Sequence, residues 1–286
     1  MVTAQSQNRR MKIAAVQMIS SPDWAENREA AARLVAQAAA AGAQLVALPE
    51  YFCLLGRRDT DKLALAEDAG VGPIQDFLAA TARKHGIWLV GGTLPIKTSG
   101  AAAESLRVLN RCLVHGPDGS PVGHYDKVHL FAYDNGRESY DEGRTLFAGS
   151  RPTVLHVGPL ADGRMLRVGL SICYDLRFPE LYRALMTPPC DLIVVPSAFT
   201  HTTGQAHWEV LLRARAIENQ CYVLAPAQGG QHVNGRRTWG HSMLIDPWGV
   251  VVDMREEGEG YVIGELDAER LTQVRTQLPA LTHRRL

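Results

Sequence analysis

The stretch GLSICYDLRFPELYR, residues 169–183, joins a run of apolar residues to a segment with the pattern of a helix. Residues 167–173 predict a buried strand, and residues 177–186 predict a helix. Cys173 therefore lies at the point where the strand ends and the chain turns. A lone buried cysteine is most often a small core residue, but a thiol at the end of a strand can also serve as a nucleophile. The remaining sequence has to decide between these two interpretations.

The overall composition is that of a globular protein. The chain has 286 residues, of which 46% are hydrophobic and 21% are charged, and its formal net charge is zero. A neutral chain without a basic block argues against nucleic acid as the main partner and against electrostatic binding to an anionic membrane. No apolar run approaches the length of a transmembrane helix.

The five cysteines are scattered along the chain and are never spaced as CxxC. This pattern does not suit a disulfide framework and predicts a reducing compartment, the cytoplasm. Residues 1–10 lack the apolar segment of a secretory signal, and we expect them to form a disordered leader. No linker interrupts residues 11–286, which we expect to form a single domain.

Apolar runs alternate with amphipathic segments along the chain. Besides the two elements named above, the patterns predict strands at residues 12–18, 44–50, 87–95, 191–199, 221–228, 240–252 and 260–267, a hairpin at 106–127, and helices at 27–43, 74–86, 206–219 and 268–278. Residues 128–152 show no periodicity and predict a long functional loop. Continuous apolar strands separated by helices indicate an α/β fold whose sheet is mostly covered.

Three reactive side chains follow predicted strands. Glu50 comes directly after the apolar run LVALP, Lys127 follows the strand that contains VGHYD, and Cys173 follows VGLSI. Because ligands of α/β sheets gather at strand ends, we expect the three side chains to share one pocket. There the carboxylate can accept the thiol proton, and the lysine can stabilise the thiolate and a developing oxyanion. The turn after Cys173 leaves the backbone N–H of Tyr174 free to donate to the same oxyanion.

Each of these residues, taken alone, also has a structural explanation. Cys173 can be a core residue, Glu50 can cap a helix or be solvated, and Lys127 can be a surface lysine. The sequence around the three residues therefore has to distinguish a catalytic role from a structural one.

The segments LVALPEYF, YDKVHLF and GLSICYDLRFPEL resemble the three signature segments of the nitrilase, or carbon–nitrogen hydrolase, superfamily. By this resemblance the Glu-Lys-Cys triad of the family falls on Glu50, Lys127 and Cys173. The second glutamate of the family, between the lysine and the cysteine, falls on Glu142, with Glu138 or an ordinary solvated acid as the alternatives. The resemblance also implies a four-layer α-β-β-α sandwich that forms a homodimer or a larger homo-oligomer.

The second half of the chain resembles the branch of this family that contains deaminated glutathione amidase and omega-amidase. The piece AQGGQH, residues 227–232, favours the former. The resemblance implies an enzyme that cleaves a small carboxamide to an acid and ammonia through a thioester, in metabolite repair. Omega-amidase activity on 2-oxoglutaramate, N-carbamoyl amino acid hydrolysis, nitrile hydrolysis and a non-enzymatic scaffold are the alternatives.

Further residues are candidates for substrate binding. Tyr51 and Phe199 lie beside strand ends and are expected as pocket walls or as core residues, and His207 lies near the start of a helix, facing the pocket or bonded to backbone. Arg177 is expected to pair with Asp175 and brace the turn at Cys173, with a substrate carboxylate as its alternative partner.

The sequence also predicts ion pairs on one helix, and it lacks the motifs of metal and phosphate sites. Glu209 with Arg213, and Arg215 with Glu218, have the spacing of ion pairs on one helix. The ten histidines show no zinc-binding spacing, and no glycine-rich phosphate loop is present. The sequence therefore predicts no metal and no organic cofactor.

Overall fold

The computed structural model describes residues 9–99 and 106–285. Residues 1–8 of the predicted leader lie outside these ranges. Strand β1 (Arg10–Gln17) begins one residue before the predicted domain boundary, so that Arg10 belongs to a sheet.

The first sheet has eight strands, in the order β16-β1-β2-β3-β5-β4, with β6 and β9 also paired to β5. Strands β1, β2 and β3 run parallel to one another, and β16 is antiparallel to β1. Besides β1, the strands are β2 (Leu45–Ala47), β3 (Trp88–Val90), β4 (Leu94–Lys97), β5 (Val108–His115), β6 (Pro121–Asp126), β9 (Leu146–Phe147) and β16 (Gly260–Asp267).

The second sheet has six strands, in the order β10-β11-β12-β13-β14-β15. Its three central strands are parallel, and its outer strands are antiparallel to their neighbours. The strands are β10 (Thr153–Val157), β11 (Leu166–Leu170), β12 (Leu192–Val194), β13 (Tyr222–Ala225), β14 (Ser242–Ile245) and β15 (Val251–Arg255). Strand β10 is not predicted by the sequence pattern.

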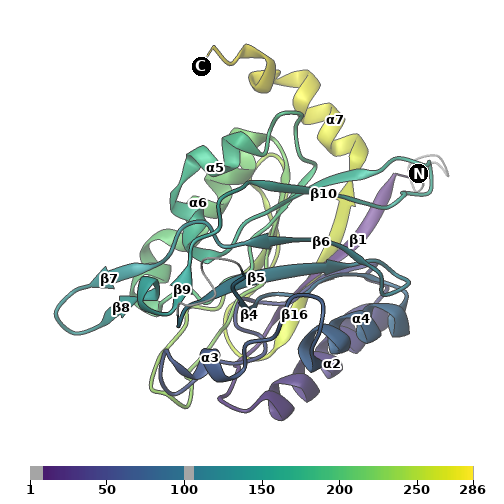
Figure 1. Ribbon diagram of the computed structural model, residues 1–286. Coiled ribbons are helices and arrows are strands. Elements are labelled where there is room, and N and C mark those ends of the chain that lie inside the picture. The colour runs from purple at the N-terminus through teal and green to yellow at the C-terminus, as the bar shows by residue number, and fades with distance from the viewer. Residues whose placement is uncertain (1–8, 100–105, 286) are drawn as a thin grey trace.

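Helices cover the outer face of each sheet, as Figure 1 shows. Helices α2 (Trp24–Ala40) and α4 (Pro73–His85) pack on the first sheet, and α5 (Pro179–Ala184) and α6 (His201–Asn219) pack on the second. The predicted α-β-β-α sandwich is confirmed. The short helix α3 (Asp61–Ala64) was not predicted, and α7 (Ala268–Gln277) follows β16 directly. None of the helices in the described residues is long and apolar enough to cross a membrane.

The alternation of side chains along β1 explains the layers. Ile13 and Ala15 face the second sheet and belong to the core between the sheets. Ala14 and Val16 point to the opposite face and pack against α2 and α4. All four side chains are fully buried, because this strand is covered on both faces.

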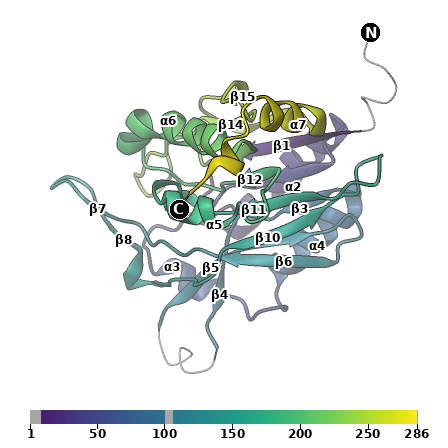
Figure 2. The same ribbon diagram turned by 90° about the horizontal axis from the view of Figure 1, so that it is seen from above.

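The predicted strand at residues 87–95 is two strands, β3 and β4, which pair separately with β5. Residues 128–152 are not a simple loop, because they contain the hairpin of β7 (Ala132–Asp134) and β8 (Ser139–Asp141), the 3₁₀ turn Glu142–Arg144, and β9. The hairpin projects beyond the sandwich (Figure 2).

Helix α6 begins at His201, five residues before the predicted start at 206. Gly204 suggested a loop, but its backbone packs so closely on Trp239 that an added Cβ would lie 2.3 Å from that side chain. The glycine therefore serves a close contact within the helix rather than a break in it.

Candidate active site

Both sheets contribute to one cluster of reactive side chains. Glu50 follows β2 and Lys127 follows β6, both in the first sheet, whereas Cys173 follows β11 in the second sheet and begins the 3₁₀ turn Cys173–Arg177. Glu50 and Lys127 are 1% and 0% exposed, so neither is the solvated charge that its residue type alone suggests. The structure therefore brings the three predicted residues to the boundary between the two sheets.

Lys127 lies between two carboxylates. Its Nζ is 2.8 Å from Oε1 of Glu50 and 2.8 Å from Oε2 of Glu142. Glu142 also accepts hydrogen bonds from the Tyr51 hydroxyl at 2.7 Å and from the backbone N–H of Phe131 at 2.7 Å. Glu50, Lys127 and Glu142 are called the carboxylate–lysine cluster below.

Glu138 stands outside this cluster. It lies in the β7–β8 connection and accepts a hydrogen bond from the Thr202 hydroxyl at 3.3 Å. Of the two glutamates left open by the sequence, Glu142 is therefore the one that contacts Lys127.

The charges of Lys127 and Glu142 hold each other in their ionised forms. Burial on its own would lower the pKa of Lys127, but the charges of Glu142 and Glu50 outweigh it and hold this pKa above its ordinary value. Burial would likewise raise the pKa of Glu142, but the Lys127 ammonium and the hydrogen bonds to the carboxylate hold it below its ordinary value. Lys127 is therefore an ammonium and Glu142 a carboxylate at neutral pH.

The Glu50 side chain is fixed on both of its oxygens. Oε1 accepts from the Asn110 side chain at 3.0 Å as well as from Lys127, and Oε2 accepts from the backbone N–H of Ala198 at 2.9 Å. The Gln228 side chain donates to the Glu50 backbone carbonyl at 3.0 Å. Sequence motifs did not indicate Asn110, Ala198 or Gln228, because these supports come from three separate parts of the chain.

The backbone at Cys173 is in the left-handed region, with φ of 49°, which is uncommon for a residue with a side chain. Its N–H donates to the Pro196 carbonyl at 3.0 Å, which ties the turn to the end of β12. Burial and the negative charge of Glu50 raise the pKa of the thiol well above its ordinary value, although Lys127 opposes the shift. Cys173 is therefore a thiol at neutral pH, and it needs a base when it reacts.

The predicted pair between Asp175 and Arg177 is wrong. The buried Asp175 instead accepts hydrogen bonds from the Tyr125 hydroxyl at 2.8 Å, from the His129 backbone at 3.0 Å, and from the Ile172 backbone at 2.8 Å. Nδ1 of His129 also lies 2.7 Å from Asp175. Tyr125 and His129 flank Lys127, so Asp175 fastens the lysine segment to the cysteine turn.

Arg177, the last residue of the turn that begins at Cys173, contacts His207 of helix α6. A guanidinium nitrogen of Arg177 is 3.2 Å from Nδ1 of the exposed His207, and the guanidinium lies 5.2 Å from the centre of the Phe199 ring and 6.0 Å from that of Tyr174. His207 does not line either of the pockets described below.

The two predicted ion pairs on α6 are confirmed. Glu209 and Arg213 are 3.3 Å apart, and Arg215 and Glu218 are 2.8 Å apart. Arg215 also donates to the Leu176 carbonyl at 2.8 Å, so this helix supports the turn that carries Cys173.

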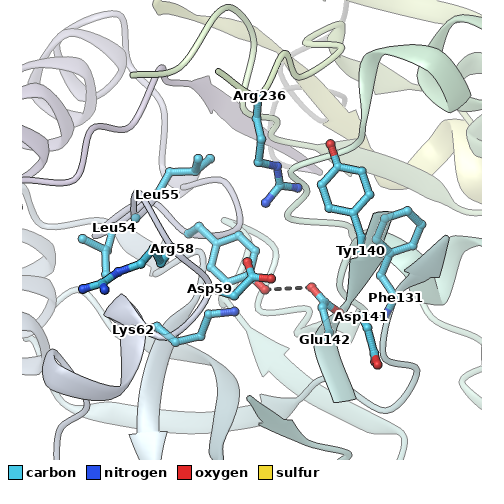
Figure 3. Close-up of a pocket in the computed structure, with 12 residues that line it drawn as sticks. Leu54, Leu55, Arg58, Asp59, Lys62, Phe131, Tyr140, Asp141, Glu142 and Arg236 are labelled. Carbon is cyan, nitrogen blue, oxygen red and sulfur yellow. Dashed lines mark hydrogen bonds between the residues drawn. The ribbon is translucent and has the colours of Figure 1, made fainter. Parts of the chain in front are cut away.

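Two pockets adjoin the cluster. The cysteine pocket, of about 200 Å³, is lined by Phe131, Cys173, Tyr174, Ala198, Phe199, Thr200 and Thr203. The outer pocket, of about 490 Å³, is shown in Figure 3 and includes Tyr51, Lys62, Phe131, Tyr140, Glu142 and Arg236 in its lining. Phe131 borders both pockets. The sequence patterns indicated Tyr51, Phe199 and Tyr174. They did not indicate Lys62, Phe131, Tyr140 or Arg236, which lie in irregular or very short elements.

The described residues contain no group of three or more His, Cys, Asp or Glu side chains that could hold a metal ion. All five cysteines are free.

Residues 12–276 match the model of the carbon–nitrogen hydrolase family. The chain belongs to this family. It is therefore a hydrolase of the class that acts on amides, as the sequence motifs predict.

Two relatives of this carbon–nitrogen hydrolase carry different activity names. The deaminated glutathione amidase of Synechocystis sp. strain PCC 6803 is 43% identical over 273 residues, covering 95% of this chain and 97% of the relative. The omega-amidase NIT2-A of Xenopus laevis is 36% identical over 277 residues, covering 96% and 95%.

Solved structures agree with the fold. The Caenorhabditis elegans NitFhit protein is 38% identical with a TM-score of 0.84, and the match covers 96% of this carbon–nitrogen hydrolase but 65% of the NitFhit chain. A variant amidase from Nesterenkonia sp. AN1 is 27% identical with a TM-score of 0.75, covering 94% and 98% of the two chains. That structure shows acrylamide added at the active-site cysteine of the Nesterenkonia enzyme.

The link through Asp175 predicts a specific effect on turnover. Tyr125→Phe removes one of the hydrogen bonds that Asp175 accepts. We expect this variant to lower the free energy of unfolding by about 1 kcal/mol and kcat by about tenfold. The matched control is Tyr182→Phe, since the buried Tyr182 hydroxyl bonds the Ser171 hydroxyl at 3.0 Å and, within the described residues, forms no hydrogen bond with Asp175 or with residues 121–129. Urea unfolding and steady-state kinetics measure both effects. Equal losses of kcat in the two variants would contradict the positioning role.

The contact between Glu142 and Lys127 gives a second prediction. Glu142→Gln removes one of the charges that raise the pKa of Lys127, and we expect kcat to fall by about a hundredfold. Glu138→Gln changes a glutamate of the same segment that does not contact Lys127, and should keep the wild-type kcat. Steady-state kinetics on one amide substrate test the pair. A fully active Glu142→Gln enzyme would exclude the role of this carboxylate.

Proposed function

We propose that this carbon–nitrogen hydrolase cleaves the amide bond of deaminated glutathione through a thioester on Cys173. The observation that carries the proposal is the meeting of the Cys173 thiol, which lines a pocket, with the carboxylate–lysine cluster. The names of the similar proteins favour this substrate, and they make omega-amidase activity the second candidate.

In the first half of the reaction, Glu50 takes the proton of the Cys173 thiol while the sulfur forms a bond to the amide carbon. The raised pKa of the thiol makes a base necessary at this step. Lys127 and the backbone N–H of Tyr174 stabilise the oxyanion; this N–H forms no hydrogen bond with another group in the described residues. The carbon–nitrogen bond then breaks, and Glu50 returns the proton to the leaving amine.

In the second half, water replaces the amine. Glu50 takes one proton from the water as its oxygen attacks the thioester carbon, and the carbon–sulfur bond breaks. The acid leaves, and the proton on Glu50 returns to the sulfur. Glu142 holds Lys127 in place and keeps it charged through both halves. These steps need no cofactor, because Glu50 returns the first proton to the leaving amine and the second to the sulfur.

The leaving group depends on the substrate. Primary amides such as 2-oxoglutaramate release ammonia, as the resemblance to the family implies. Deaminated glutathione instead releases the amine of cysteinylglycine, because its scissile amide joins an oxoglutaryl group to that dipeptide. Release of the acid is therefore the measurement common to both candidates. N-carbamoyl amino acids and simple nitriles are the remaining candidates, and kinetics on all four substrates rank them.

We propose substrate-binding roles for several residues around the pockets. Phe199 forms a wall of the cysteine pocket and Tyr51 a wall of the outer pocket. Arg177 is half-buried and stacks on Phe199, where it can meet a carboxylate on the acyl part of the substrate. His207 contacts Arg177 and orients its guanidinium.

We also propose a homodimer or a larger homo-oligomer in the cytoplasm. Helix α6 exposes the apolar side chains of Val210 and Ile217, and Trp248 is also exposed. Apolar side chains of this kind are suited to contacts between subunits. The free cysteines are suited to a reducing compartment.

The central test is Cys173→Ala, which removes the nucleophile without adding volume. We expect acid release to fall by at least about a thousandfold while the fold persists. Cys53→Ala is the matched control, since Cys53 is 1% exposed and lines neither pocket. Near-wild-type turnover by Cys173→Ala would refute the mechanism.

Thiol labelling separates an enzyme from a scaffold protein. Cys173 is 7% exposed and opens to a pocket, whereas the other four cysteines are at most 1% exposed. Iodoacetamide should therefore modify one thiol, at Cys173, in step with loss of activity. An inert Cys173 would favour the scaffold alternative.

A further inference from the structure

Two cations of the outer pocket have no carboxylate partner. Lys62 lies 5.3 Å from the centre of the Tyr51 ring, and Arg236 lies 4.7 Å from that of the Tyr140 ring. Both are half-buried, and neither forms an ion pair within the described residues. Figure 3 shows their side chains extending toward the pocket from opposite sides. Unpaired cations that face one cavity suit an anionic ligand.

Most of the other charges lining this pocket already contact an opposite charge. The pairs are Arg58 with Asp61 at 3.5 Å, Asp141 with Arg144 at 3.2 Å, and Glu142 with Lys127 at 2.8 Å. The remaining lining charges are Lys62, Arg236 and the exposed Asp59. Lys62 and Arg236 are therefore the lining cations that are left without an ion-pair partner among the described residues.

The environment of Lys62 also favours an incoming carboxylate. Burial lowers the pKa of its ammonium, and the positive charges of Lys127 and Arg236 lower it further, against the opposing effects of Glu142 and Asp59. A ligand carboxylate between Lys62 and Arg236 would reduce the repulsion between the two cations and would form an ion pair with each of them.

Positive charges lie on both sides of the reacting cysteine. Phe131 borders the cysteine pocket on the side of the outer pocket, where Lys62 and Arg236 lie. Arg177 instead contacts Tyr174 and Phe199, which line the cysteine pocket itself. A substrate attacked by Cys173 would then have its acyl half beside Arg177 and its amine half directed past Phe131 toward the outer pocket.

We propose that Lys62 and Arg236 bind a carboxylate on the amine half of the substrate. This inference rests on the proposed function, and it narrows the substrate class to amides that carry a carboxylate at both ends. An oxoglutaryl dipeptide has this form. A primary amide such as 2-oxoglutaramate has one carboxylate, on its acyl half, and leaves the outer pocket unused.

Kinetics with two matched substrates test the subsite. Lys62→Met and Arg236→Met remove the charges and keep most of the side-chain volume. For the oxoglutaryl dipeptide we expect each variant to raise KM by about tenfold or more, with kcat changed much less. For 2-oxoglutaramate we expect a far smaller change in KM. Lys97→Met is the control, because Lys97 pairs with Asp68 at 3.0 Å and lines neither pocket.

A binding measurement keeps this test separate from the proposed function. In Cys173→Ala, titration calorimetry measures the affinity for the intact oxoglutaryl dipeptide without turnover, and adding Lys62→Met should weaken it by about tenfold. Equal effects on both substrates, or unchanged binding in the calorimeter, would overturn the subsite. Failure of the wild-type enzyme to cleave either substrate, with binding still dependent on Lys62, would instead refute the proposed reaction.

Discussion

The buried ammonium of Lys127 is the constraint on which the active site depends. Moving a charged lysine out of water costs several kcal/mol, and only closely placed opposite charges offset that cost. Glu50 and Glu142 provide them at 2.8 Å each. Because the two glutamates come from distant parts of the chain, the end of β2 and the segment after β8 must both converge on the end of β6. Burial of the Lys127 ammonium therefore requires these three segments of the chain to meet.

The second sheet is attached to this cluster through the cysteine turn. Asp175 binds Tyr125 and His129 on either side of Lys127, and Arg215 holds the turn from helix α6. These contacts keep the Cys173 thiol beside a carboxylate that raises its pKa. The thiol is therefore protonated at neutral pH, and in the proposed mechanism the same carboxylate is the base. One set of buried contacts thus supports both packing and chemistry.

The sequence predicted the parts of the site that are encoded locally. Glu50, Lys127 and Cys173 each follow an apolar strand within a distinctive motif, and the layers follow from continuous apolar runs. The partner of Asp175 was predicted wrongly, because spacing along the chain favoured Arg177 while the fold brings Tyr125 and His129 closer.

The outer pocket could not be predicted from periodicity. Lys62 belongs to a four-residue helix and Arg236 to an irregular segment, so neither lies in a regular pattern. Their shared function becomes visible only when the fold brings them to one cavity. Residues that recognise a substrate on such segments are generally less predictable than those that close a strand.

The most direct test of this account is the mass of the enzyme during turnover. Acid quenching in the steady state, followed by peptide mass spectrometry, should detect the acyl half of the substrate on the peptide that contains Cys173. The adduct should be labile to hydroxylamine, as a thioester is, and absent from Cys173→Ala. Turnover without any acyl adduct on Cys173, or an adduct on another residue, would contradict the account.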